Sequence, residues 1–145
     1  MSRVSTYLNF MGETEVAFQR YSEIFGTEIS QPIFRFGDIP SEPGAPALSE
    51  EELAKIMHIE LPIIGGHVLM ATDMLESAGH ELRIGNNITV NLELDTRAEA
   101  ERLYDALNDG GSNGTGLNEM PWGAYWGCCL DKFGVQWMFN APLGT

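Results

Sequence analysis

The stretch Asn87-Ile88-Thr89-Val90-Asn91-Leu92-Glu93-Leu94 alternates polar and apolar residues at every position. Neighbouring side chains of a strand point to opposite faces, so the pattern predicts a strand over residues 87–94 with one apolar and one polar face. Thr96 and Glu99 follow with the spacing of a capping box and predict a helix to about Asn108. We expect the apolar face of the strand to pack on that helix and its polar face to stay open.

The same order of elements occurs earlier in the chain. Residues 4–10 predict a strand, and a helix is predicted from about Glu13 to Phe25. Its residues Ala17 and Tyr21 match Ala100 and Tyr104 at an offset of 83 residues, and the same offset lays the strand 4–10 onto residues 87–93. This internal repeat indicates a duplicated module.

The remaining segments complete both modules. An acidic, proline-bearing loop is expected over residues 37–55, with a helical turn that starts at Ser49. The other predicted strands are 28–36, 56–63, 67–72, 124–131 and 135–141. We therefore predict one α+β domain over residues 1–145, made of two βαβββ modules at about 1–75 and 86–145. The modules would form a cupped mixed sheet with helices on its outer face and a cleft between their open faces.

Composition excludes several classes of protein. The 21 acidic against 8 basic residues give a net charge of -13, which argues against binding to nucleic acid and to anionic membrane surfaces. The two cysteines, Cys128 and Cys129, are adjacent and provide no disulfide framework. No signal-peptide pattern and no membrane-spanning apolar run is evident. We expect a protein of the reducing cytoplasm.

The polar face of residues 87–94 is the leading candidate site. Together with the last strand it would offer amide groups beside a methionine floor, a mixture that suits a small molecule with polar and apolar parts. A water-filled groove without a ligand is the alternative. The predicted ligand-binding residues are Met70, Asn87, Thr89, Asn91, Glu93, Trp122, Tyr125, Gln136 and Met138. Trp137 is assigned to the core, and Cys129 to a small buried position rather than to a nucleophile.

Several motifs resemble a known family. The segments 7–10, 17–26, 58–73 and 131–137, together with Trp122, resemble the PhnB-like branch of the vicinal oxygen chelate superfamily. That superfamily holds glyoxalase I, bleomycin- and fosfomycin-resistance proteins and extradiol dioxygenases. The resemblance implies the glyoxalase/bleomycin resistance fold, a homodimer and an unidentified small-molecule ligand.

The resemblance also implies where a metal would bind. Metal-dependent members place His and Glu in the first and last strand of each module, which here correspond to positions near Thr6, Met70, Asn87 or Thr89, and Met138. A thioether is a poor ligand for a hard divalent ion. We therefore expect neither a metal nor another cofactor, and the sequence leaves open whether binding leads to catalysis.

Two alternatives remain at this stage. A metal-dependent lyase or dioxygenase with displaced ligands would use His58 and Glu60, which share one strand face. A two-residue turn at Gly65-Gly66 places them on the face opposite Met70, whereas a longer turn reverses this. The other alternative is a resistance protein that sequesters a cationic drug, which the acidic charge permits and in which Glu93 would take part.

Overall fold

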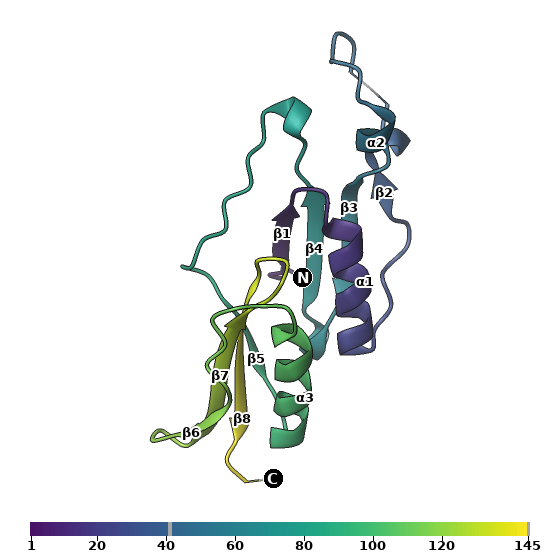
Figure 1. Cartoon of the computed structure of the whole chain (residues 1–145). Coiled ribbons are helices and arrows are strands. Elements are labelled where there is room, and N and C mark those ends of the chain that lie inside the picture. Colours follow the sequence, from purple (N-terminus) through teal and green to yellow (C-terminus); the bar gives the residue numbers. More distant parts are fainter. Residues whose placement is uncertain (41, 145) are drawn as a thin grey trace. The chain divides into compact units, whose positions relative to one another are not determined.

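The computed structural model describes residues 1–40 and 42–144 and divides into two compact units. The first unit is Met1–Leu82, and the second runs from Arg83 to the C-terminus. Each unit holds one four-stranded mixed sheet with a long helix on one face (Figure 1). The predicted α+β class and the two βαβββ modules are confirmed.

The first unit follows the predicted order of elements. Its elements are β1 (Thr6–Phe10), α1 (Thr14–Phe25), β2 (Phe34–Arg35), the short helix α2 (Glu50–Leu53), β3 (Ile56–Pro62) and β4 (Val68–Asp73). The strands lie side by side in the order β1-β4-β3-β2, with β1 parallel to β4 and the other neighbours antiparallel. The predicted helical turn at Ser49 is α2, where the Ser49 hydroxyl accepts a hydrogen bond from the Glu52 backbone.

The second unit repeats this plan. Its elements are β5 (Val90–Glu93), α3 (Arg97–Asn108), β6 (Asn118–Met120), β7 (Ala124–Leu130) and β8 (Gln136–Pro142). The strand order is β5-β8-β7-β6, and β5 is parallel to β8. The strand β6 is not among the predicted strands.

Each core lies between a helix and one face of its sheet. In the first unit, the buried stripe of α1 packs on β3 and β4, and Phe18, Ile59 and Leu69 are fully buried. In the second unit α3 packs on β7 and β8, and Trp137 and Phe139 are fully buried. The assignment of Trp137 to the core is confirmed. The other face of each sheet is not covered by the helix of its own unit, and we call these the first and second open faces.

Two predicted strands are shorter in the structure. Of residues 28–36 only Phe34–Arg35 form a strand, since Pro32 lacks the backbone N–H that a ladder requires. Of residues 87–94 only Val90–Glu93 form β5. Ahead of β5 the carbonyl of Ile88 accepts a hydrogen bond from the side chain of Gln136 at 2.7 Å, so a side chain takes the place of a backbone partner there.

The strand offset between the modules also differs from the expectation. Met70 pairs with Tyr7, and Met138, at the matching place in the second unit, pairs with Asn91. The first strands are therefore offset by 84 residues, whereas the helices start 83 residues apart. The helix begins seven residues after Tyr7 but only six residues after Asn91, so the strand of the second unit is shifted by one place in the alternation of its side chains.

The two long helices begin in different ways. Thr96 caps α3 as predicted, because its hydroxyl accepts a hydrogen bond from the Glu99 backbone at 3.2 Å. Glu13 provides no such bond for α1. Instead the buried carboxylate of Asp73, at the end of β4, accepts hydrogen bonds from the Thr14 backbone at 3.2 Å and from its hydroxyl at 2.7 Å. Thus α1 takes its cap from a distant strand.

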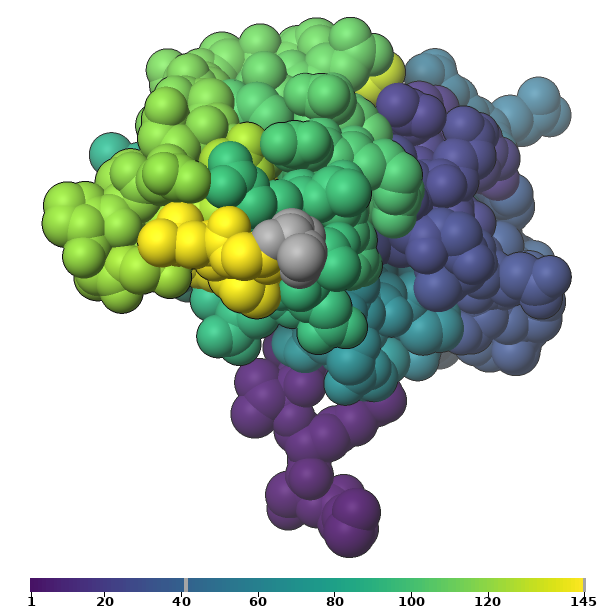
Figure 2. All heavy atoms as spheres, turned by 90° about the horizontal axis from the view of Figure 1, so that it is seen from below, coloured from purple at the N-terminus to yellow at the C-terminus, as the bar shows by residue number. Residues whose placement is uncertain are grey.

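The first and last described residues, Met1 and Gly144, are exposed. Met1 and Val4 are exposed, and the N-terminal residues project from the surface in Figure 2, where they are purple. At the other end, Pro142 of β8 pairs with Ala124 at the start of β7. Within the described part of the chain, no helix is long and apolar enough to cross a membrane.

Candidate functional site

The second open face is built by alternation along three strands. Two cross-strand rows lie next to each other on it. In one row Asn91, Met138 and Cys128 are neighbours on β5, β8 and β7. In the adjacent row Glu93, Asn140 and Trp126 are neighbours, and Asn118 of β6 continues it. Further side chains of this face are those of Leu130 and Gln136.

Two side-chain amide groups on this face are hydrogen-bonded to each other. The side-chain nitrogen of Asn140 donates to the side-chain oxygen of Asn91 at 2.7 Å. An amide carries two N–H donors and an oxygen with two lone pairs, so this bond leaves both groups with capacity for a further partner. Gln136 holds the segment before β5 through Ile88. The face therefore presents positioned donors and acceptors beside an indole and a thioether.

The structure brings four of the predicted ligand-binding residues together. Asn91, Glu93, Gln136 and Met138 all lie on the second open face. Asn87 and Thr89 precede β5 and are exposed outside the strand. Trp122 lies in the turn before β7 with 67% of its surface exposed. Met70 lies in the first unit.

The remaining predicted residue, Tyr125, lies on the opposite side of its sheet. Only 8% of its surface is exposed, and its hydroxyl donates a hydrogen bond to Glu101 of α3 at 2.9 Å. The guanidinium of Arg97 lies over its ring, 3.9 Å from the centroid, and also pairs with Glu119 at 2.8 Å. Tyr125 therefore joins α3 to β7 and is not part of the second open face.

The residues that sequence reasoning missed come from β6 and β7. Trp126, Cys128 and Asn118 lie in the two rows beside the predicted residues. The sequence contained the information needed to place Cys128 and Trp126. A hairpin with its turn at Lys132-Phe133-Gly134 sets Cys128 opposite Met138 and Trp126 opposite Asn140.

The two neighbouring thiols lie on different faces of β7. Cys129 is 4% exposed, and burial, together with the nearby carboxylate of Asp131, raises its pKa to about 12. A thiol with that pKa is not a nucleophile at neutral pH, so the assignment of Cys129 to a small buried position is confirmed. Cys128 is half-buried in the row of Met138.

The first open face contains a histidine and a glutamate in contact. The turn between β3 and β4 is longer than two residues, and Glu60 pairs with Met70. Glu60 and His58 therefore lie on the same face as Met70, and the two-residue turn is the wrong alternative. His58 Nε2 and Glu60 Oε2 are 2.8 Å apart. The ring of Tyr7, which neighbours Met70 on β1, lies 5.9 Å from that of His58.

The donor set does not fit the metal site of metal-dependent relatives. Within residues 1–40 and 42–144, no group of three or more His, Cys, Asp or Glu side chains could hold a metal ion. The three histidines have separate partners: His58 contacts Glu60, His67 contacts Thr6 at 2.8 Å, and His80 accepts from the Leu75 backbone at 2.9 Å. The matching places in the last strands carry the thioethers of Met70 and Met138, which suit soft rather than hard ions.

Comparison with known proteins gives one family. A family model described as Glyoxalase/Bleomycin resistance protein/Dioxygenase superfamily matches residues 5–139. Among curated proteins, Protein YjdN from Escherichia coli (strain K12) is 28% identical over 142 residues, which cover 94% of this chain and 93% of YjdN.

Solved structures agree with the fold. Protein PA1353 from Pseudomonas aeruginosa superposes with a TM-score of 0.82 and 32% identity, and the match covers 98% of each chain. The PhnB protein from Bacillus cereus superposes with a TM-score of 0.74 and 21% identity, covering 97% of this chain and 99% of that one. At that identity the second match supports the fold alone.

Proposed function

This chain belongs to the Glyoxalase/Bleomycin resistance protein/Dioxygenase superfamily, and we propose that it binds a small organic molecule on the second open face without a metal ion. One observation carries the proposal. The strands β5, β8 and β7 bring amide, carboxylate, thioether and indole groups into two adjoining rows. Such a combination of apolar surface and a few placed polar groups is typical of small-molecule sites.

The chemistry of the rows defines the ligand that fits them. Trp126 and Met138 offer apolar and polarisable surface, which favours a ring or an aliphatic part of the ligand. Asn91 and Asn140 form hydrogen bonds with uncharged polar groups, and Glu93 accepts from an N–H or O–H donor. The ligand is therefore a molecule with both polar and apolar parts.

A measurement on Cys128 tests where binding occurs. Its thiol lies between Trp126 and Leu130 along β7, on the face in question. A compound that co-purifies with the protein, detected by native mass spectrometry, should slow alkylation of Cys128 when it is added back to ligand-free protein. Glu93→Gln and Asn91→Ala should weaken this protection, whereas Glu28→Gln, an exposed acidic residue of the first unit, should not. Binding with unchanged Cys128 alkylation would contradict the proposal.

One observation favours a second candidate, a metal-dependent lyase or dioxygenase with displaced ligands. His58 and Glu60 are in contact on the first open face, on the same side as Met70. Imidazole and carboxylate are common ligands of zinc, iron and nickel. Metal analysis of the purified protein, and thermal shifts with zinc, manganese, nickel and iron, distinguish the two proposals. A stoichiometric metal that is lost in His58→Ala would favour the second candidate over the first.

We also propose that the chain forms a homodimer in the reducing cytoplasm. The family resemblance supports this, and Tyr7 and Phe34, with 48% and 39% of their surfaces exposed, give the first open face apolar surface that a second copy would cover. Sedimentation velocity over a range of protein concentrations tests it, and a Tyr7→Ser variant should shift the equilibrium toward the monomer.

A further inference from the structure

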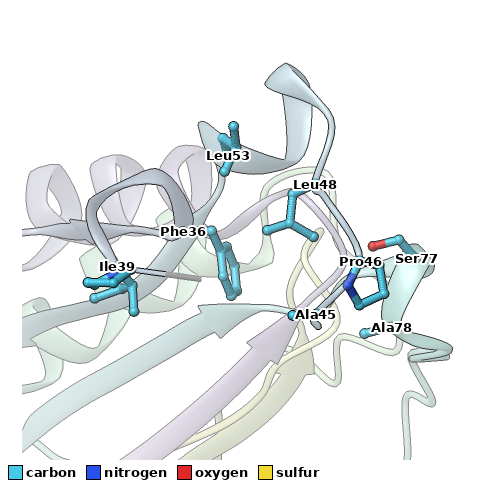
Figure 3. A pocket seen from close by; sticks show the side chains of 9 residues that line it. Phe36, Ile39, Ala45, Pro46, Leu48, Leu53, Ser77 and Ala78 are labelled. Atoms are coloured by element: carbon cyan, nitrogen blue, oxygen red, sulfur yellow. The ribbon is translucent and has the colours of Figure 1, made fainter. Parts of the chain in front are cut away.

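A separate pocket lies in the first unit, between the loop after β2, the helix α2 and the turn at residues 76–78 (Figure 3). Its volume is about 260 Å³. The lining residues are Phe36, Ile39, Pro40, Ala45, Pro46, Leu48, Leu53, Ser77 and Ala78. None of them belongs to either open face, so a ligand here would be independent of the proposed function.

The lining is apolar except for one hydroxyl. The Ser77 hydroxyl donates a hydrogen bond to the carboxylate of Glu52 at 2.7 Å. The pocket wall therefore contacts a ligand mainly through apolar groups and provides hardly any hydrogen-bond donors. The volume lies just below the range of about 300–1,000 Å³ that is typical of sites for drug-sized molecules, so the occupant is smaller than those.

The segments that build the pocket carry charge of one sign. Residues 36–54 and 74–82 contain no Lys or Arg, and the basic residues that flank them, Arg35, Lys55 and Arg83, are outnumbered by seven carboxylates. Their acidic residues are Asp38, Glu42, Glu50, Glu51, Glu52, Glu76 and Glu81. Glu52 is tied to the pocket wall through Ser77, and this hydrogen bond lowers the pKa of Glu52 and favours its ionised form at neutral pH. The field of these carboxylates attracts a cation and repels an anion.

We infer that this pocket binds a small organic cation, an amine or quaternary ammonium with an aromatic or branched aliphatic body. The apolar body fills the space between Phe36, Leu48 and Leu53, and the ammonium group faces the carboxylate of Glu52. Phe36 adds an aromatic ring to the lining, and cations are attracted to the faces of such rings. Both features are needed to select an organic cation. The apolar lining alone would also accept uncharged apolar molecules, and the acidic segments alone would also attract small hydrophilic cations.

Three probes of similar size and different charge test the inference. Benzyltrimethylammonium, benzyl alcohol and benzenesulfonate are titrated into isotope-labelled protein and followed by amide NMR. The cation should bind about fivefold more tightly than the alcohol, the ratio that roughly 1 kcal/mol of exposed charge attraction gives. The sulfonate should not bind. The amides whose signals shift should lie in residues 36–54 and 76–78. Added salt should weaken the binding of the cation and leave the binding of the alcohol unchanged.

Two kinds of variant separate the apolar and the electrostatic contributions. Ala45→Leu and Ala78→Leu each place a larger side chain in the pocket and should abolish binding, and the pair guards against one of them misfolding. Glu52→Gln should reduce the cation's advantage over the alcohol about threefold, the effect of one exposed charge. Asp105→Asn removes an exposed charge from α3 in the second unit and should leave binding unchanged.

Several results would overturn the inference. Equal affinity for alcohol and cation would show that charge has no role. Shifts confined to the first open face would show that the cation binds elsewhere. If the protein self-associates at high concentration and then no longer binds the cation, a second copy of the chain covers the pocket. Protection of Cys128 tests the proposed function independently, so the failure of one proposal is distinguishable from the failure of the other.

Discussion

The indole Nε1 of Trp137 donates a hydrogen bond to Oδ2 of Asp131 at 2.8 Å, and the two residues are 0% and 4% exposed. The other oxygen of Asp131 accepts from the backbone N–H groups of Phe133 and Val135, at 2.9 and 3.0 Å. One carboxylate thus closes the turn between β7 and β8 and anchors it to the core. This fixes the register that sets Met138 beside Cys128 on the second open face.

Replacing Asp131 by Asn should destabilise the protein. An amide has a single oxygen, so at least one of the three buried donors loses its acceptor, at a cost of about 2–3 kcal/mol in the free energy of unfolding. Urea unfolding followed by tryptophan fluorescence measures this. The exposed substitution Asp105→Asn should stay within about 0.5 kcal/mol of the wild type. Trp137→Phe with Asp131→Asn should cost less than the sum of the single changes, and strict additivity would contradict the coupling.

The carboxylate of Asp73 should contribute more than an ordinary helix cap. It accepts hydrogen bonds from Gly12, Thr14 and Ile56 and so joins α1, β3 and β4. Asp73→Ala leaves several buried donors unpaired and should lower the free energy of unfolding by about 3 kcal/mol or more.

The matched control for Asp73 is the cap of α3. Thr96→Ala removes one partly exposed cap bond and should cost about 1 kcal/mol. Hydrogen exchange should show that Asp73→Ala releases the first turn of α1 while α3 keeps its protection. Equal losses in the free energy of unfolding for Asp73→Ala and Thr96→Ala would contradict the larger role assigned to Asp73.

The ion pair between Glu15 and Arg35 should make a small pH-dependent contribution. The hydrogen bond from Arg35, 2.7 Å to the carboxylate, lowers the pKa of Glu15 below its ordinary 4.5. The unfolded chain then binds the proton more tightly than the folded one, so the stabilisation is present above the ordinary pKa and is lost as the pH falls through the lowered value.

Solvent screens this pair, because both side chains are more than one third exposed. Glu15→Gln should therefore lower stability by less than about 1 kcal/mol at neutral pH. Thermal unfolding from pH 7 to about pH 3 should show the difference between variant and wild type shrinking on acidification and in high salt. A difference that grows on acidification would contradict the sign.

The two thiols should react at very different rates. At pH 8 the buried Cys129, with its pKa raised to about 12, is almost wholly protonated, whereas Cys128 lies on the second open face. Ellman's reagent should therefore show one fast thiol per folded chain and two after unfolding. Cys128→Ser should remove the fast reaction and Cys129→Ser should retain it.

Periodicity predicted most of the fold. Alternation in residues 87–94 and the helical spacing of Ala17 and Tyr21 each identified an element, because both patterns report directly which side of the element is buried. The N-caps at Ser49 and Thr96 were confirmed for a similar reason, since each cap depends on residues only three positions apart.

Contacts between distant segments account for what the sequence could not predict. The start of β5 depends on where β8 offers a backbone partner, and the face of Glu60 depends on the length of one turn. Tyr125 was grouped with the ligand-binding residues although alternation along β7 directs it toward α3. In each case the missing information was a register between strands, which a shift of one residue inverts.

The cap of α1 has a consequence for the order of events during synthesis. Thr96 is available to α3 as soon as the helix itself has left the ribosome. The N-terminus of α1 must wait for Asp73, which is 59 residues further along the chain than Thr14. Closing so long a loop carries an entropic cost before any contact offsets it. The N-terminus of α1 therefore forms late during synthesis, whereas α3 is capped by the residue that directly precedes it.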